Sequence, residues 1–393
     1  MPFFRFYLLY QTLYLLLMAG LYIHIPFCTQ KCIYCDFLSG TNLSLRQHFI
    51  DALIAEMDYY LDFFDNDKIH TIYFGGGTPS LLTIAELKKI YDAIASRWNV
   101  DEVEEFTIEC NPDDLSEDYL RDLKTLPINR LSIGVQSFCD DELKWLNRRH
   151  TAKEAIEAVF RAKSIGFDNI TIDLMFALPV QTINSLNCSI DKVLELGVQH
   201  ISAYSLMFEP DSKITKLMDL NRLEPLDEDL SADMFDLLST RLTSAGYEQY
   251  EISNYAKPGF HSRHNSGYWC GMRYLGLGPS AHSFDGEKRW SNVAHTIKYN
   301  NLVKTNLQDV CSIELLNADE RFNELVFTAL RTKVGLDLLY LKCKFGDEHY
   351  AKLLKLAQKH IDSGTMQIIN NHLSLTRRGI YVSDSIISDF MIV

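Results

Sequence analysis

The chain has 393 residues and a formal charge of −14, with 47% apolar and 12% aromatic residues. This apolar content is that of a folded globular protein and excludes disorder as the main state. At this length we expect one large domain and a smaller second one. The acidic balance argues against a nucleic-acid binder, because such proteins need positive charge to displace the counterions of phosphate.

The cysteines do not have the pattern of a disulfide framework. They are odd in number, and most are scattered singly along a long chain. We therefore expect free thiols and a cytoplasmic location. The nine are Cys28, Cys32, Cys35, Cys110, Cys139, Cys188, Cys270, Cys311 and Cys343.

The N-terminus begins with an apolar run over residues 3–18. This run is shorter than the ~20 residues that a membrane-spanning helix needs, contains Arg5, and lacks a small-x-small cleavage site. Because Met18 stands just before a strand-like pattern, we interpret residues 1–17 as an upstream extension that is dispensable. A membrane-associating segment is the alternative.

From residue 18 to 209, short β-rich runs alternate with longer amphipathic stretches, which is typical of a parallel sheet with crossover helices. The pattern predicts an α/β fold, a partial parallel (β/α)6 barrel. The expected strands are Leu21–Pro26, His70–Phe74, Glu105–Cys110, Arg130–Val135, Asn169–Met175 and Gln199–Ser205. The expected helices are Leu43–Leu61, Ile84–Trp98, Glu117–Lys124, Ala152–Ile165 and Ile183–Leu196.

Residue types that carry chemistry follow the predicted strands. Cys28 follows the first, Gly75–Pro79 the second, Glu109 closes the third and Gln136 follows the fourth, while Asp173 lies inside the fifth. Active sites of parallel barrels lie at the carboxyl ends of the strands. We therefore expect these side chains to form one site.

The rhythm changes over residues 210–393, where we predict a smaller α+β C-terminal domain. It has a helix at Asp227–Ala245, an irregular aromatic and glycine-rich stretch, a helix at Ala318–Thr332 and a hairpin-like pair near Met366–Leu375. This end resembles a winged helix. With a net charge of −14, we do not expect it to bind nucleic acid.

The strongest local signal is Cys28-Thr-Gln-Lys-Cys32-Ile-Tyr-Cys35, a C-x3-C-x2-C spacing. Three thiolates in one short loop can hold three irons of a four-iron cluster and leave the fourth iron open. A zinc site with His24 as the fourth ligand and a group of buried core thiols are the alternatives.

Several motifs in order resemble the radical S-adenosylmethionine superfamily, and more narrowly the oxygen-independent coproporphyrinogen III oxidases and their relatives. They are Tyr22-Ile-His-Ile-Pro-Phe-Cys28, the cysteine loop, Tyr73-Phe-Gly-Gly-Gly-Thr-Pro79, Thr107-Ile-Glu-Cys-Asn-Pro112, Arg130 to Phe138, Leu146-Asn-Arg-Arg-His150, Asp173 to Pro179 and His264 to Trp269. The resemblance covers the chain from about residue 20.

The resemblance implies a 4Fe-4S cluster on Cys28, Cys32 and Cys35 and a bound S-adenosylmethionine. The residues that match cofactor contacts are Tyr22, Tyr34, Gly76, Gly77, Thr78 and Glu109. Gln136, Arg148 and Asp173 match contacts that serve a second S-adenosylmethionine in the oxidase. Taken singly, each is equally an ordinary turn, capping or solvated residue.

Two departures separate the chain from the oxidases. Those carry a fourth cysteine two residues after the third, where this chain has Phe37, and a longer N-terminal arm. Both departures match the heme chaperone branch, HemW. His264-Asn-Ser-Gly-Tyr268-Trp269 fits the H-N-x-x-Y-W heme motif of that branch, with His264 as iron ligand and Tyr268 and Trp269 as flat apolar surface. Without the resemblance, His264 would be a structural or surface histidine.

Cys270 and His282 are weaker candidates near this motif. The resemblance thus predicts a heme chaperone that binds a 4Fe-4S cluster, S-adenosylmethionine and heme and delivers heme to respiratory proteins. An oxygen-independent coproporphyrinogen III dehydrogenase is the leading alternative, and a radical enzyme with another substrate is the third. The sequence leaves weak membrane association and a homodimer open.

Overall fold

The computed structural model describes residues 18–64, 68–210 and 212–392. The predicted extension, residues 1–17, lies outside the described residues. No described helix combines the length and apolar character needed to cross a membrane.

Six parallel strands form the centre of the molecule, in chain order along the sheet. They are β1 (Ala19–Ile25), β2 (Ile69–Gly76), β3 (Glu105–Cys110), β4 (Arg130–Gln136), β5 (Asn169–Phe176) and β6 (His200–Ser205). Each agrees with a predicted strand to within about two residues. The expected α/β class is confirmed.

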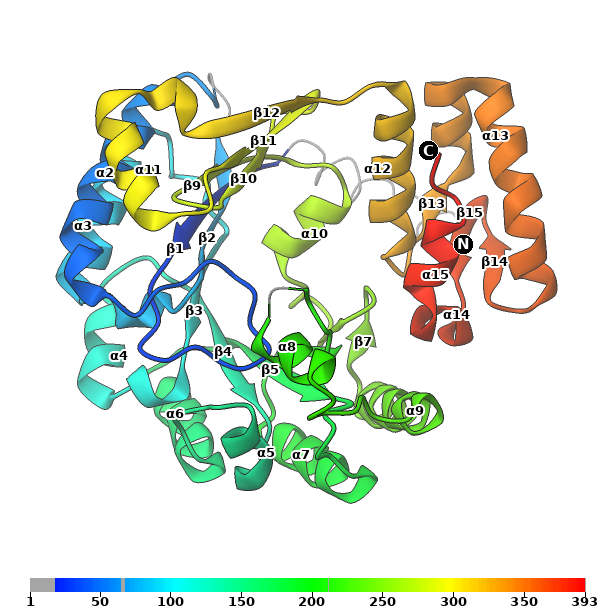
Figure 1. Ribbon diagram of the computed structural model, residues 1–393, viewed down its shortest axis with the longest axis horizontal. Coiled ribbons are helices and arrows are strands. Elements are labelled where there is room, and N and C mark those ends of the chain that lie inside the picture. Colours follow the sequence, from blue (N-terminus) through cyan, green and yellow to red (C-terminus); the bar gives the residue numbers. More distant parts are fainter. Residues whose placement is uncertain (1–17, 65–67, 211, 393) are drawn as a thin grey trace.

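Helices connect these strands and lie along the outside of the curved sheet (Figure 1). They are α2 (Arg46–Tyr59), α3 (Ile84–Ala95), α4 (Glu117–Leu123), α5 (Asp140–Trp145), α6 (Ala152–Ser164) and α7 (Ile183–Leu196). Two more helices, α8 (Lys213–Asp219) and α9 (Glu228–Ser244), come after β6. Capping boxes define three of the starts, because Thr83, Thr151 and Thr182 each exchange hydrogen bonds with the residue three positions on.

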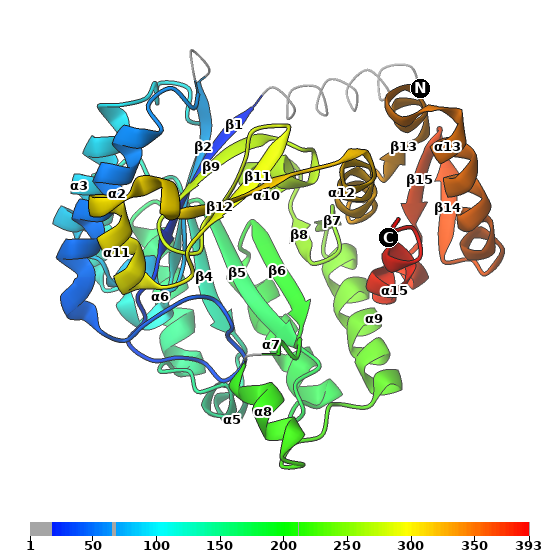
Figure 2. The ribbon, with the colours of Figure 1, turned by 45° about the horizontal axis from the view of Figure 1, so that its top comes forward.

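The sheet continues beyond both edges of the six strands. Within the described residues its order is β12-β11-β10-β9-β1-β2-β3-β4-β5-β6-β8-β7, so β1 and β6 do not pair and the barrel is open. The added strands are β7 (Glu248–Gln249), β8 (Asn254–Ala256), β9 (Arg273–Leu277), β10 (His282–Phe284), β11 (Lys288–Asn292) and β12 (Cys311–Leu315). Helix α10 (Arg263–Trp269) lies inside the arc, and α11 (Thr296–Thr305) packs on α2 (Figures 1 and 2).

The remaining elements form a separate body beside the arc (Figure 2). They are α12 (Ala318–Leu330), β13 (Leu336–Asp337), α13 (Leu338–Asp362), β14 (Met366–Ile369), β15 (His372–Leu375), α14 (Arg377–Tyr381) and α15 (Ser383–Ser388). Its apolar core runs from Phe322 to Phe390, whereas the main core contains residues from Ala19 to Val310. The predicted division at residues 209 and 210 therefore falls inside the region that builds the main core.

A buried carboxylate joins the added strands to the barrel helices. Glu56 of α2 is fully buried and accepts hydrogen bonds from the Gly278 amide at 2.8 Å and from Asn292 and Tyr299 at 2.5 Å each. These three donors come from the β9–β10 turn, β11 and α11. The carboxylate thus links α2 to three segments that are distant in the chain.

Replacing Glu56 by Ala should lower the free energy of unfolding by about 3 kcal/mol, because three buried donors lose their acceptor. Urea unfolding followed by circular dichroism measures this change. The matched control is Asp58→Ala on the same helix, whose exposed carboxylate pairs with Arg97 at the surface and should change stability by less than about 0.5 kcal/mol. Equal effects of the two substitutions would contradict the structural role of Glu56.

Candidate functional site

The three clustered cysteines lie in the loop after β1. This loop is closed at its base, because the Cys28 amide donates to the Gly40 carbonyl and the Gly40 amide to the Pro26 carbonyl, both at 3.0 Å. Cys28, Cys32 and Cys35 are all partly exposed free thiols. The short, closed loop keeps the three thiols in one neighbourhood.

Two of the thiols receive hydrogen bonds from side chains outside the loop. Thr78 Oγ1 donates to Cys28 Sγ, and Arg148 Nη1 donates to Cys32 Sγ, each at 3.3 Å. Burial raises the pKa of the Cys35 thiol to about 11. Donors directed at sulfur stabilise thiolate, the form that binds metal.

The donor set of the loop, three cysteine thiols, is chemically compatible with a multi-iron cluster. In the part of the chain that the structure describes, no three His, Cys, Asp or Glu side chains converge to hold one metal ion. A four-iron cluster takes one thiolate at each of three irons, so its ligands do not need to converge on one atom. His24, the ligand of the zinc alternative, contacts the Leu38 carbonyl at 2.9 Å through Nε2.

The glycine run at the end of β2, Gly75–Gly77, lies directly against the base of the cysteine loop. The Gly77 amide donates to the Ile25 carbonyl at 2.8 Å and the Thr78 amide to the Phe27 carbonyl at 2.7 Å. A Cβ at Gly77 would stand 2.6 Å from the Phe27 oxygen, and Gly76 has φ +101°. Only glycine allows this close approach of two backbones.

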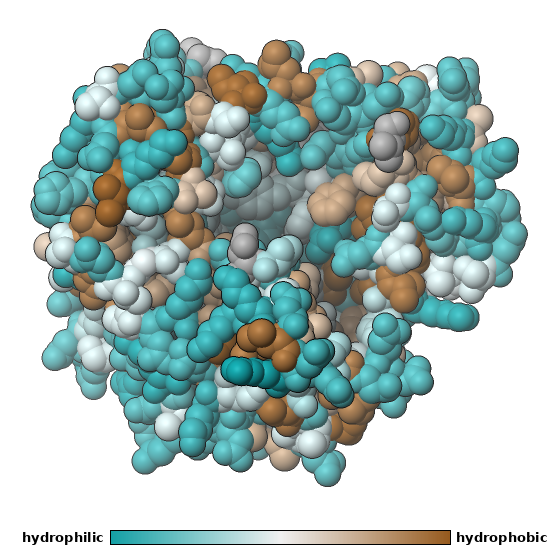
Figure 3. All heavy atoms as spheres, in the orientation of Figure 1, coloured by the Kyte–Doolittle hydropathy of each residue, from teal (hydrophilic) through white to brown (hydrophobic). Residues whose placement is uncertain are grey.

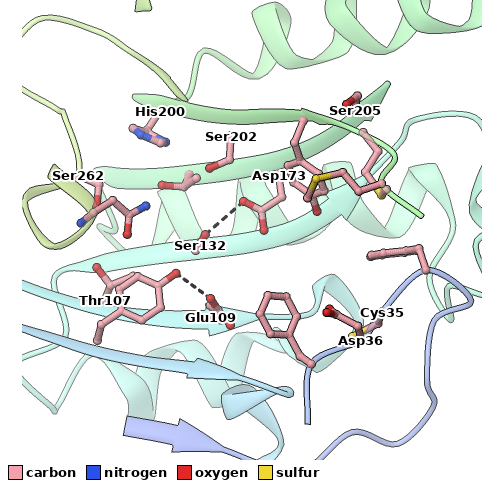
Figure 4. Close-up of a pocket in the computed structure, with 18 of the residues that line it drawn as sticks. Cys35, Asp36, Thr107, Glu109, Ser132, Asp173, His200, Ser202, Ser205 and Ser262 are labelled. Carbon is pink, nitrogen blue, oxygen red and sulfur yellow. Dashed lines mark hydrogen bonds between the residues drawn. The ribbon is translucent and has the colours of Figure 1, made fainter. Parts of the chain in front are cut away.

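A cavity of about 450 Å³ extends along the inner faces of β2 to β6. Of the predicted cofactor residues, Tyr34, Glu109 and Asp173 line it, together with Cys35. In Figure 4, Cys35 and Asp36 lie at one end and His200 and Ser262 at the other. The face of the molecule shown in Figure 3 has a hollow near its centre.

Polar contacts hold the predicted residues on the inner side of the sheet. Glu109 accepts from the Tyr73 hydroxyl at 2.8 Å and from the Gly76 amide at 3.0 Å. Gln136, which has φ +71°, accepts from the Tyr204 hydroxyl at 2.7 Å. Tyr22 contacts His24 Nδ1 at 3.1 Å. Tyr73 and Tyr204, which were not among the predicted site residues, line the cavity with Glu109, and the Tyr22 ring lies 6.1 Å from that of Tyr73.

Two of the carboxyls that line the cavity, those of Glu109 and Asp173, have raised pKa values. Burial raises the pKa of Glu109 to about 7, and nearby Asp173 adds to this shift. Burial also raises the pKa of Asp173 to about 6, although Ser132 Oγ donates to it at 3.4 Å. Both groups therefore change charge near neutral pH.

Helix α10 carries the H-N-x-x-Y-W residues and is held at its start by Glu105 of β3. The Glu105 carboxylate accepts from the Arg263 amide at 2.9 Å, the His264 amide at 3.0 Å and Ser262 Oγ at 3.3 Å. Ser262 and Asn265 line the same cavity as Cys35. The structure thus brings the start of α10 to the end of the cavity farthest from the cysteine loop, whereas His264, Tyr268 and Trp269 are not among the residues that line it.

His264 is almost completely buried, at 1% exposure. Its Nδ1 contacts Thr71 Oγ1 and its Nε2 contacts the Tyr268 hydroxyl, both at 2.8 Å, and its ring stacks on Tyr73. Burial lowers the pKa of His264 to about 3, so the ring is neutral. A neutral imidazole is the form that ligates iron, but both nitrogens have protein partners here.

The remaining candidate residues in and near the motif, Tyr268, Trp269, Cys270 and His282, have surroundings that differ from those of His264. Tyr268 packs edge-on against Tyr274 of β9, and Trp269 stacks on the guanidinium of Arg331, which follows α12. Burial raises the pKa of Cys270 to about 11, and the His282 side chain is exposed on β10. Sequence reasoning missed Thr71, Glu105 and Arg331, because no local pattern marks a partner that lies far away in the chain.

The contribution of Glu109 and Asp173 to the free energy of unfolding should fall as pH rises from 5 to 8. A carboxyl whose pKa is raised by folding stabilises the folded state at low pH, and this contribution is lost as pH rises through the folded pKa. Glu109 and Asp173 should together account for roughly 3 kcal/mol of this decline. Urea unfolding at pH 5 and pH 8 should therefore show a smaller decline in the Glu109→Gln, Asp173→Asn double variant. An unchanged decline would show that these carboxyls titrate normally.

Comparison with known proteins places the chain in a family. The model of the radical SAM superfamily matches residues 22–193, and that of the HemN C-terminal domain matches residues 316–382. The E. coli coproporphyrinogen III oxidase HemN has the same fold, with a TM-score of 0.82 and 22% identity over 95% of this chain and 90% of that one.

Curated relatives extend over nearly the whole chain. The heme chaperone HemW of Bacillus subtilis is 36% identical over 95% of this chain and 99% of its own length. The heme chaperone HemW of Lactococcus lactis is 33% identical over 94% of this chain and 97% of its own length. At this identity and coverage, the chain belongs to the HemW family of the radical SAM superfamily.

Proposed function

We propose that this protein is a heme chaperone that binds heme at α10 and transfers it to respiratory proteins. Kinship with proteins named heme chaperone HemW over almost the full chain is the observation that carries this proposal. The cysteine loop adds support, because Phe37, 63% exposed, stands where the oxidases have their fourth cysteine. The likeness to the oxidase HemN concerns the fold.

Membership of the superfamily implies a 4Fe-4S cluster and S-adenosylmethionine. We propose that Cys28, Cys32 and Cys35 hold the cluster, and that the polar part of the cavity around Glu109 and Asp173 binds S-adenosylmethionine. The remaining proposed contacts are Tyr22, Tyr34, Gly76, Gly77, Thr78, Gln136 and Arg148. When bound, the cluster and S-adenosylmethionine together would supply one-electron chemistry. The fit is supported by the two donors to sulfur.

The proposed heme contacts are His264, Tyr268 and Trp269. If His264 Nε2 coordinated the heme iron, it would have to give up its hydrogen bond with the Tyr268 hydroxyl. The neutral state of the buried imidazole favours this exchange, since no proton must leave first. A cytoplasmic location belongs to the same proposal and is consistent with nine free thiols.

Anaerobic titration of the cluster-loaded protein with heme should give saturable 1:1 binding, followed by Soret absorption. His264→Ala should weaken this binding at least about tenfold, because the iron loses its ligand. The matched control is His261→Ala, a half-exposed histidine three residues away that pairs with Glu248 and should leave the affinity unchanged.

No specific binding by the wild type would contradict the chaperone proposal. Formation of protoporphyrinogen from coproporphyrinogen III under reducing anaerobic conditions would favour the dehydrogenase instead. Release of 5′-deoxyadenosine with another modified product and no heme affinity would indicate a different radical enzyme.

Replacing Cys32 by Ala should abolish the 4Fe-4S cluster, because one iron loses its only protein ligand. Iron and sulfide analysis after anaerobic reconstitution measures this loss. The control is Cys188→Ala, which removes an exposed thiol on α7 and should leave the iron content at the wild-type value. A full cluster in Cys32→Ala would contradict the assignment.

A further inference from the structure

The segment Leu146–Arg148, between α5 and α6, packs against the cysteine loop and forms hydrogen bonds with it. We call it the supporting segment. The Ile33 amide donates to the Leu146 carbonyl at 3.4 Å. Asn147 makes two more contacts at 2.9 Å, because its side chain donates to the Lys31 carbonyl and its own carbonyl accepts from Gln30. Three of the residues between the cysteines are thus attached to this one segment, Lys31 and Ile33 through their backbones and Gln30 through its side chain.

Packing and backbone conformation hold the supporting segment in position. Leu146 is fully buried and belongs to the same apolar cluster as Ile33 of the cysteine loop. Asn147 has φ +61°, a left-handed conformation that asparagine tolerates better than most residues. This turn directs the next side chain, Arg148, toward the loop. The supporting segment therefore holds both the cysteine loop and the positive charge of Arg148 beside it.

The Arg148 guanidinium is positioned by contacts on both of its terminal nitrogens. Nη2 donates to Asn111 Oδ1 at 2.6 Å and to the Gly134 carbonyl, while Nη1 donates to Cys32 Sγ at 3.3 Å. Its Nε is out of contact with solvent and has no partner among the described residues. The positive charge is thus fixed at one of the three proposed cluster ligands.

The charge has a consequence for the cluster. Reduction adds one electron, taken from a low-potential one-electron donor, and makes the thiolate-bound cluster more negative by one unit. Hydrogen bonds to the sulfurs and nearby charges set the reduction potentials of such clusters. A fixed positive charge at Cys32 Sγ favours the reduced form over the oxidised form.

We propose that Arg148 tunes the 4Fe-4S cluster through Cys32, in addition to any contact with S-adenosylmethionine, and that Leu146–Arg148 is the structural support of the cysteine loop. This inference rests on the cluster assignment of the proposed function, but not on heme binding. Resemblance alone placed Arg148 among the cofactor contacts. The hydrogen bond to sulfur comes from the structure.

The test is the midpoint potential of the reconstituted cluster, measured by anaerobic dithionite titration with electron paramagnetic resonance. In Arg148→Met the ratio of reduced to oxidised cluster at a fixed potential should fall about tenfold, which is about 59 mV for one electron. Arg148→Lys should recover part of this shift, because it restores the charge without the fork of donors. Thr78→Val, which removes a neutral donor to Cys28, should give a smaller shift.

The matched control is Arg149→Met. It removes the same charge one residue later, from an exposed arginine that pairs with Asp113 and Asp114, and it should leave the potential unchanged. If Arg148→Met does not hold a cluster, Arg148→Gln and Arg148→Lys provide the neutral and charged comparison. A wild-type potential in a cluster-loaded Arg148→Met or Arg148→Gln would overturn the proposal, as would a wild type that assembles no cluster. A normal cluster without heme binding would overturn the chaperone proposal alone.

Discussion

The parallel pairing of β1 with β2 is the constraint on which the candidate site depends. The pairing continues past the strands, because the amides of Gly77 and Thr78 donate to carbonyls of Ile25 and Phe27. The glycine run and the base of the cysteine loop therefore form one backbone unit. Because the glycines have no side chains, the two backbones can approach each other closely. This approach brings the Thr78 hydroxyl within hydrogen-bond distance of Cys28 Sγ.

The second organising feature is the attachment of α10 to the starts of β2 and β3. Glu105 holds the first amides of the helix, and Thr71 holds the ring of His264. Because the strands are parallel, their starts lie at one end of the cavity and their carboxyl ends at the other. The start of α10, with Ser262 and Asn265, and the end of the cysteine loop, with Cys35, thus lie at opposite ends of one cavity.

The electrostatics of the cavity differ between its parts. Two carboxyls with raised pKa values lie on the inner side of the sheet, whereas the guanidinium of Arg148 lies at the cysteine loop. Burial disfavours the ionised carboxyls, while hydrogen bonds to Asn111 and Gly134 fix the guanidinium. Groups that ionise near neutral pH therefore lie along the inner face of the sheet, and one guanidinium is held at the proposed cluster ligand Cys32.

Local sequence determined the elements and the chemistry of the loop. Hydrophobic alternation predicted β1 to β6 to within about two residues, and the C-x3-C-x2-C spacing indicated an iron–sulfur site, because both depend on residues close together in the chain. Only the tertiary structure decided the partners of His264 and Arg148. Thr71 is 193 residues from His264, and Arg148 is 116 residues from Cys32. Contacts over such separations depend on the register and curvature of the whole sheet, which no local pattern contains.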